Sequence, residues 1–165
     1  MNLFTLLAKY DSSASSYLQI LEERSKDKVE CNLISSGNQK RLLSCMKLLI
    51  QEDIAKCIAF QKAFSLIFDG TTDSSKKEAC SIIVRFVETS DKTRPTIQER
   101  LFDVFTTGDT TSENLEAAIV ERLQNGHIDL DWLVSQSYDG ASNMRGAING
   151  LQARMNKRSP KAIYT

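Results

Sequence analysis

Between residues 39 and 60, apolar side chains recur at steps of three and four, which is the spacing of one face of an α-helix. A stripe of this kind usually packs into a hydrophobic core, and we expect this one to do so. Its members are Leu42, Met46, Leu49, Ile50, Ile54, Cys57 and Ile58.

The residues before this helix form a more polar, mixed segment. Residues 2–10 predict a short helix, and residues 17–23 predict one or two further helical turns. The sequences SSASS and ISSGN predict a loop and a break, because Ser, Gly and Asn favour turns. We therefore predict two regions, a helical N-terminal segment over residues 1–60 and a second region over residues 61–165.

After residue 60 the hydrophobic period shortens, which indicates strands. Residues 64–68 are a short apolar run typical of a strand buried on both faces, and residues 79–87 are rich in β-branched side chains. Residues 97–105 alternate and predict a third strand. One face of that strand would carry Ile97, Glu99, Leu101, Asp103 and Phe105, and the other Phe102 and Val104.

The sequence GDTTSENLEAAIVERLQNG predicts the next helix. Thr110 and Glu113 match the S/T-x-x-E capping box, in which each side chain satisfies a free backbone amide at the helix start. Gly126 is the expected left-handed residue at the C-terminal end. The apolar stripe of this helix is Leu115, Ala118, Ile119 and Leu123.

A fourth strand is predicted over residues 132–138, and it ends in the sequence SYDG. A further helix is expected to end before Pro160, with Gly146 and Gly150 letting another backbone approach closely. Residues 162–165 predict the start of another strand. The apolar positions of the helix are Met144, Ile148, Leu151 and Met155.

These elements give the order β-β-β-α-β-α after a helical N-terminal segment. Three consecutive strands favour antiparallel hairpins, and the helix before the fourth strand makes that strand parallel to one of the others. We therefore predict an α/β fold with a mixed sheet and helices packed on its faces. This order resembles that of ribonuclease-H-like folds.

The composition of the 165 residues, with 41% apolar and 25% charged residues, is that of one globular domain with at most a small appendage. Lys plus Arg and Asp plus Glu both number 21, so the net charge gives no argument for nucleic acid or membrane binding. No apolar run reaches the ~18 residues of a membrane span, and the N-terminus does not predict a signal peptide.

The cysteines are far apart and, with the single histidine His127, do not have the spacing of a zinc site. We expect buried, reduced thiols in a cytosolic or nuclear protein. The four cysteines are Cys31, Cys45, Cys57 and Cys80.

Two Asp-Gly sequences carry the candidate chemistry. Asp69 follows the first predicted strand in FSLIFDGTTD, and Asp139 follows the fourth in SYDG. If those strands are parallel neighbours, both carboxylates emerge at one end of the sheet, where paired carboxylates bind divalent metal ions for phosphodiester chemistry. The alternative is that each is only the first polar residue of a turn. Ile67 stands where a D-x-D-G-T phosphatase needs its nucleophilic aspartate, which excludes that reaction.

Two longer stretches resemble a known family, KAFSLIFDGTTDSSKKEACSIIVRF and SQSYDGASNMRGAINGLQARMNKRSPKAIY. They are similar to the transposase domain of hAT-superfamily elements. More closely, they resemble an uncharacterised branch of that superfamily found in zinc-finger MYM-type proteins and similar transposon-derived genes. The resemblance covers roughly residues 39–165.

This resemblance implies a ribonuclease-H-like fold and a D-D-E site that uses Mg²⁺ or Mn²⁺ for DNA cleavage and strand transfer in the nucleus. Asp69 matches the first aspartate of the family, and Asp139 matches the second. Asp73 lies in the same motif, either supporting a ligand or capping the following turn. Asn143 either orients Asp139 or simply belongs to the first turn of the helix.

The chain departs from the family pattern after Asp139. Residues 140–165 contain no acidic residue, so no third acid is found, and the zinc finger that would bind transposon ends is missing. We therefore expect a C-terminally truncated core that retains two of three metal ligands and has little or no activity alone. The sheet edge left exposed would favour self-association.

The same acid-free stretch carries several basic side chains, for which the resemblance suggests contacts to DNA phosphates. The alternative is that these cations complement a helix C-terminus and solvate the surface. They are Arg145, Arg154, Lys157, Arg158 and Lys161.

Three functions remain open on the sequence. The first is a transposase fragment that is inactive alone. The second is a domesticated protein-interaction or chromatin-associated module, in which the two aspartates are relics. The third is a compact nuclease whose missing acid comes from Asp73 or from dimerisation.

Overall fold

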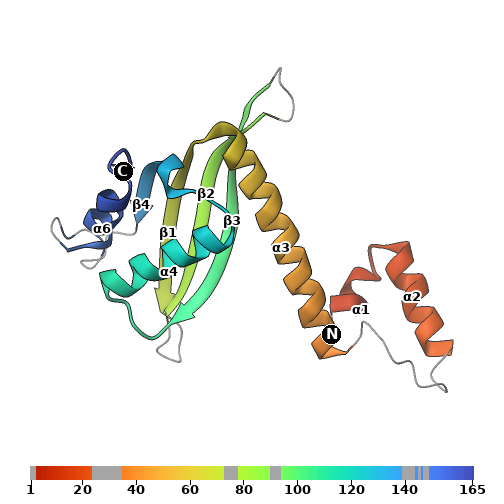
Figure 1. The fold of residues 1–165 in the computed structure, drawn as a ribbon. Coiled ribbons are helices and arrows are strands. Elements are labelled where there is room, and N and C mark those ends of the chain that lie inside the picture. Colours follow the sequence, from red (N-terminus) through yellow and green to blue (C-terminus); the bar gives the residue numbers. More distant parts are fainter. Residues whose placement is uncertain are drawn as a thin grey trace. The chain divides into compact units, whose positions relative to one another are not determined.

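The computed structural model describes residues 3–23, 35–72, 78–89, 94–138, 144, 146 and 149–165. The chain divides into two compact units, Met1–Leu49 and Ile50–Thr165. The first unit is helical, and the second contains all the strands of the described residues (Figure 1).

In the first unit, α1 (Leu3–Leu7) is followed by a longer helix, α2 (Ser12–Glu23). The predicted short helix near the N-terminus is confirmed, but the loop predicted from SSASS is wrong. The side chain of Asp11 accepts a hydrogen bond from the backbone N of Ala14 at 2.8 Å. This bond caps the helix, so the serines that follow form its first turns.

The third helix, α3 (Ser36–Gln61), begins inside the break predicted from ISSGN. The hydroxyl of Ser35 accepts a hydrogen bond from the backbone N of Asn38 at 3.2 Å. A serine before a helix satisfies a free amide of the first turn. The same residues that signal a break therefore start the helix here.

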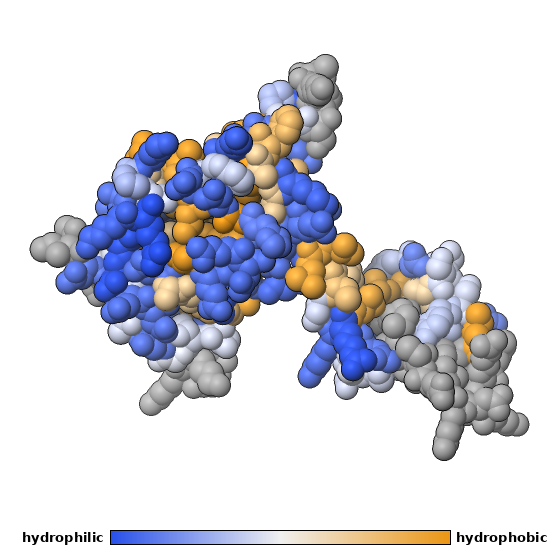
Figure 2. Space-filling model, in the orientation of Figure 1, coloured by the Kyte–Doolittle hydropathy of each residue, from blue (hydrophilic) through white to orange (hydrophobic). Residues whose placement is uncertain are grey.

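The apolar stripe of α3 divides into a buried and an exposed part. Ile54 and Ile58 are buried, as expected, but Met46, Leu49 and Ile50 are exposed, so the prediction that the whole stripe packs into a core is wrong. Apolar surface is visible along this helix in Figure 2. Only the turns nearest the sheet have a core to pack on. Neither α3 nor any other helix in the described ranges is long and apolar enough to cross a membrane.

A five-stranded mixed sheet, in the order β3-β2-β1-β4-β5, forms the second unit. Its strands are β1 (Phe64–Thr72), β2 (Glu78–Glu88), β3 (Thr96–Thr107), β4 (Leu133–Tyr138) and β5 (Ile163–Tyr164). β2 is antiparallel to β1 and β3, whereas β4 is parallel to β1 and to β5. α4 (Ser112–Asn125), followed by the 3-10 turn η1 (Leu130–Trp132), connects β3 to β4. The predicted order, the parallel first and fourth strands and the final strand are confirmed.

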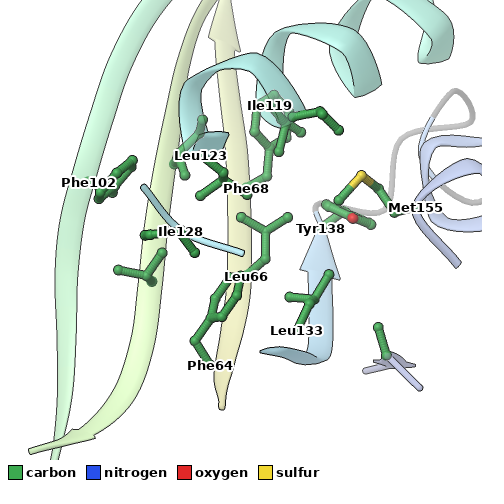
Figure 3. Packing of buried hydrophobic residues seen from close by; sticks show 14 of the residues in the cluster. Phe64, Leu66, Phe68, Phe102, Ile119, Leu123, Ile128, Leu133, Tyr138 and Met155 are labelled. Carbon is green, nitrogen blue, oxygen red and sulfur yellow. The ribbon is translucent and has the colours of Figure 1, made fainter. Parts of the chain in front are cut away.

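One face of the sheet is covered by helices and holds the core (Figures 1 and 3). We call the side that carries Phe64, Leu66 and Phe68 the inner face, and the opposite side the outer face, since side chains alternate along a strand. α4, the end of α3 and α6 (Leu151–Arg158) all contribute to the inner core. Their buried side chains there include Ile54, Ile58, Leu115, Ile119, Leu123, Leu151 and Met155.

β3 contains a bulge, which sequence alternation alone does not predict. Its neighbour β2 pairs Ile82 with Asp103 and Ile83 with Leu101, so Phe102 is the inserted residue. A bulge keeps two consecutive side chains on one side, so the predicted alternation of this strand is wrong. The inner side carries Phe102, Asp103 and Phe105, and the outer side carries Ile97, Glu99, Leu101 and Val104.

Contacts with α4 confirm this assignment of faces. The Asp103 carboxylate lies 3.6 Å from the guanidinium of Arg122 in α4. The same guanidinium stacks over the Phe105 ring, 3.7 Å from its centroid. Both residues of β3 therefore face the helix layer.

The N-terminal cap of α4 is one residue later than the predicted capping box. Thr111, not Thr110, is the N-cap, and its hydroxyl accepts a hydrogen bond from the backbone N of Asn114 at 3.4 Å. Asp109 fixes the preceding turn by accepting a hydrogen bond from the backbone N of Thr111 at 2.9 Å. The pairing of Thr110 with Glu113 as a capping box is therefore wrong.

At its other end, α4 stops at Asn125, and the left-handed residue that follows the helix is His127, not the predicted Gly126. Gly126 has φ −86°, whereas His127 has φ 60°. The backbone N of Ile128 donates to the carbonyl of Leu123 at 2.9 Å, as in a left-handed helix stop. Gly126 is needed for another reason, because a Cβ there would overlap the ring of Phe102.

The last helix is shorter in the described residues than predicted. α6 begins after Gly150, Met144 is buried, and Ile148 lies outside the described residues. The predicted approach of another backbone at the two glycines is not what the structure shows, because the glycines approach each other instead. The backbone N of Gly150 donates to the carbonyl of Gly146 at 2.8 Å, and a Cβ on Gly150 would overlap the backbone of Gly146.

Candidate metal centre

Asp69 lies inside β1, which continues to Thr72, so the predictions that it follows the strand or begins a turn are wrong. The two Asp-Gly sequences still belong to neighbouring strands, β1 and β4. Phe68 of β1 pairs with Tyr138 of β4 in the parallel ladder. Asp69 follows the first of these residues in the sequence, and Asp139 follows the second. Asp139 itself lies outside the described residues. The residues that precede the two aspartates are therefore side by side.

Asp69 is the candidate ligand that the structure describes. Its side chain is exposed, and by strand alternation it belongs to the outer face, opposite to the buried Phe68. It pairs with Ser81 of β2, whose hydroxyl donates to the Asp69 carbonyl oxygen at 3.3 Å. The backbone at Asp69 is thus held in the sheet while its carboxylate remains accessible to solvent.

A further carboxylate near this strand end was not singled out from the sequence. Glu78, at the start of β2, lies beside Gly70, where a Cβ would come within 2.5 Å of its Oε1 atom. Gly70 therefore leaves room for the Glu78 side chain, which by strand alternation lies on the inner side of the sheet, whereas Asp69 lies on the outer side. In the sequence, Glu78 is only the acidic residue that ends the stretch DGTTDSSKKE. The pairing of β1 with β2 brings it close to Gly70.

Beneath the end of β4 lies a buried polar pair that sequence reasoning missed. The Tyr138 hydroxyl donates to the Gln136 side-chain oxygen at 2.7 Å, and Gln136 is fully buried. The rings of Tyr138 and Tyr164 stack with 5.9 Å between centroids. Burial, and then the neighbouring Tyr164, raise the pKa of Tyr138 far above its usual range, so its hydroxyl is a neutral donor. The sequence feature that could have predicted this pair is the glutamine at an inward position of the strand LVSQSY.

Three of the four cysteines lie in the described residues. Burial, followed by the nearby Glu78, raises the pKa of Cys80 to about 11, so this thiol is protonated at neutral pH. Cys57 is half-buried, and its pKa is also raised, chiefly by burial. Cys45 is exposed, so the expectation of buried thiols is wrong for this residue, and Cys31 lies outside the described residues. Within the described ranges, no three His, Cys, Asp or Glu side chains form a cluster that could hold a metal ion.

The basic residues of α6 are largely engaged with α4. Glu116 is buried, and its carboxylate accepts hydrogen bonds from Arg158 at 2.5 Å and from Arg154 at 3.2 Å. Arg154 also lies 3.5 Å from Glu113. Burial would raise the pKa of Glu116, but the hydrogen bonds from Arg158 and Arg154 outweigh it and lower the pKa. Lys157 is exposed on the same helix.

Other residues named from the sequence fall elsewhere. Lys161 is exposed after the end of α6. Asp73, Asn143 and Arg145 lie outside the described residues, so their predicted roles stay predictions.

A pocket of about 290 Å³ lies away from this strand end, between α3 and the strands β2 and β3. Glu88, at the C-terminal end of β2, lines it, whereas Ser81 beside Asp69 is near the start of that strand. The pocket is therefore separate from the candidate metal centre. Its lining residues are Ile50, Asp53, Ile54, Cys57, Phe86, Glu88 and Arg100.

Comparison with protein families identifies the chain. A family model described as the ZMYM1/FAM200 RNase-like domain, DUF4371, matches residues 1–150. The match includes both Asp-Gly sequences and strands β1 to β4. It agrees with the mixed sheet and with the resemblance found from the sequence.

Proposed function

Because the chain belongs to the DUF4371 family of ZMYM1/FAM200 RNase-like domains, we propose that it is a transposon-derived, hAT-like transposase core. In this proposal Asp69 and Asp139 bind a divalent metal ion. The observation that carries it is the pairing of Phe68 with Tyr138, which makes the residues before the two aspartates neighbours on parallel strands.

The donors fit a hard divalent cation. Mg²⁺ is commonly bound through one or two carboxylates and keeps several waters, so two aspartates suffice for a weak site. Asp69 is exposed, which leaves its carboxylate accessible to an ion. A bound Mg²⁺ or Mn²⁺ supplies positive charge to a phosphate group. The buried hydrogen bond between Gln136 and Tyr138 holds the end of β4 from which Asp139 follows.

These 165 residues are proposed to have little or no strand-transfer activity by themselves. A D-D-E site needs a third acid, and no acidic residue follows Asp139 in this sequence. DNA is the proposed partner. Arg154 and Arg158 already pair with Glu116, so Lys157 is the better candidate for a phosphate contact among the described cations of α6.

Isothermal titration with Mn²⁺ tests the metal site. The wild-type chain should bind Mn²⁺ weakly, and the Asp69→Asn/Asp139→Asn variant should bind at least roughly tenfold more weakly. Asp131→Asn is the matched control, because Asp131 is an exposed aspartate in η1, outside β1 and β4. Equal binding by the wild type and the double variant would remove the metal ligation from the proposal.

A second candidate function is a protein-interaction module without catalysis. The observation that favours it is the exposed apolar surface of β2 and β3 on the outer face. In that case, a cellular interaction assay would give full activity with both Asp→Asn changes. Loss of the interaction in that double variant would favour the metal-dependent role.

A further inference from the structure

The outer face of β2 and β3 carries exposed apolar side chains. Val87, Ile97, Leu101 and Val104 are 39%, 63%, 56% and 54% exposed, respectively. The strand pairing places them together, with Val87 opposite Ile97 and Leu101 opposite Ile83. We call these four exposed residues the outer apolar patch.

The solvent face of an antiparallel sheet is usually polar, whereas this face carries four exposed apolar side chains among its polar ones. The charged residues at the outward positions of β2 and β3 are Arg85 and Glu99, which pair with each other at 3.3 Å. Both of these side chains are about half exposed, at 49% and 54%. The patch therefore surrounds one base and one acid and has no net charge.

The edges of the sheet are less suited to association than this face. In the edge strand β3, the carbonyl of Phe102 accepts a hydrogen bond from the side chain of Gln51 at 2.8 Å. The backbone N of Val104 is bonded to the side chain of Asp103 at 2.8 Å. A bulge and occupied backbone groups hinder the addition of another strand.

At the opposite side of the sheet, β5 pairs with Ser135 and Gln136 of β4. Part of that edge is therefore also occupied. The sequence predicted self-association through an exposed sheet edge. Because both edges are partly occupied, stacking of the outer faces is the more favourable way for two copies to associate.

We infer that the outer apolar patch is the contact between two copies of this chain, stacked outer face to outer face around a two-fold axis. In such a pair the same surface serves both partners, so it must be complementary to itself. One base and one acid side by side satisfy this requirement, because Arg85 of each copy can meet Glu99 of the other. A strongly charged partner such as nucleic acid finds no matching charge on this patch. The inference does not rest on the proposed metal site, although Asp69 lies on the same face, in one row with Ser81 and Val104.

Sedimentation equilibrium over a range of protein concentrations tests the inference. The wild-type chain should reach twice its 18.5 kDa mass as concentration rises. Leu101→Lys should weaken the dimer by roughly tenfold or more, because it places a charge in the buried centre of the contact. Phe60→Lys is the matched control, since Phe60 is 73% exposed on α3, outside the sheet, and its replacement should leave the dimer unchanged.

Charge reversal tests the two-fold geometry. Glu99→Arg should weaken the dimer, because it places arginines at both positions, and adding Arg85→Glu should restore it. A far-UV spectrum and a urea midpoint close to those of the wild type show that each variant is folded.

A monomer at every concentration would overturn the inference, and it is the result expected if the patch is covered by another protein or by a further segment of a longer chain. Equal weakening by Leu101→Lys and Phe60→Lys would also overturn it, because association would then not depend on the patch. Failure of Arg85→Glu to rescue Glu99→Arg would reject the two-fold arrangement.

Discussion

The two faces of the same sheet differ sharply in what covers them. On the inner face, Phe64, Leu66 and Phe68 are buried under helices (Figure 3). On the outer face of the same strand, Ser65 and Ile67 are half-buried and Asp69 is exposed. The strands thus build a finished core on one side and an accessible surface on the other.

This difference separates stability from function in the fold. The inner face concentrates the apolar burial that stabilises the domain. The outer face carries Asp69 at one end and the outer apolar patch on β2 and β3. Substitutions on the inner face should therefore change the free energy of unfolding, and those on the outer face should change binding.

The largest expected effect compares two leucines on opposite faces. Leu66→Ala should lower the free energy of unfolding by about 2–5 kcal/mol, because it leaves a cavity at a fully buried position. Leu101→Ala should lower it by less than about 1 kcal/mol, because that side chain is 56% exposed. Urea denaturation at a concentration where the monomer dominates measures both. Similar losses for the two variants would break the comparison of faces.

A smaller effect is expected at two neighbouring residues of β4. Gln136→Leu should cost about 1–3 kcal/mol, since it leaves the buried Tyr138 hydroxyl without its acceptor. Ser137→Ala, on the outer side, should be nearly neutral. Adding Tyr138→Phe to Gln136→Leu should recover part of the loss in the same urea titration. An additive loss in the double variant would show that the pair is not coupled.

The smallest effect concerns the helix layer over the inner face and depends on pH. The pKa of Glu116 is lowered in the folded state, so its contribution is present above the ordinary pKa of a glutamate and is lost as pH falls through the folded value. At neutral pH we expect Glu116→Gln to cost about 1 kcal/mol, because both arginine partners are partly exposed.

Urea titrations at several pH values check this prediction. The free energy of unfolding of the wild type should fall more steeply on acidification than that of Glu116→Gln. Parallel pH profiles would show that the charge of Glu116 does not contribute to stability.

The order of the strands could be predicted from the sequence, because each strand contains an apolar or alternating run. The end of β1 could not, because the strand continues through the Asp-Gly-Thr-Thr that predicted a turn. The parallel pairing of β1 and β4 followed from the helix between β3 and β4. The bulge at Phe102 could not be predicted, since alternation assumes that no residue is inserted. The exposure of Leu49 and Ile50 could not be predicted either, because the apolar stripe of a helix does not indicate how many of its turns pack against the sheet.

The exact residues at which a helix begins and ends could not be predicted from the sequence either. Two adjacent threonines fit a cap equally well by type, and only the turn at Asp109 selects Thr111. A glycine after a helix usually takes the left-handed conformation, but here His127 does so. Gly126 instead makes room for Phe102, which is distant in the sequence.

Some residues of the candidate site could be predicted from the sequence, and others could not. The sequence predicted Asp69 and Asp139 on parallel neighbouring strands, and the pairing of Phe68 with Tyr138 agrees with that, but Asp69 lies inside β1 and not at its end. Glu78 and the buried pair of Gln136 with Tyr138 were missed, because their importance depends on contacts across strands and within the core.

The most direct test of the central claim is NMR of the ¹⁵N-labelled chain during addition of substoichiometric Mn²⁺. Paramagnetic broadening reports which amides lie near the ion. If Asp69 and Asp139 bind it, the amide signals of Phe68, Asp69 and Tyr138 should lose intensity first, and the Asp69→Asn/Asp139→Asn variant should not show this loss. Broadening that is spread over the acidic surface, or that persists at these amides in the double variant, would contradict the account.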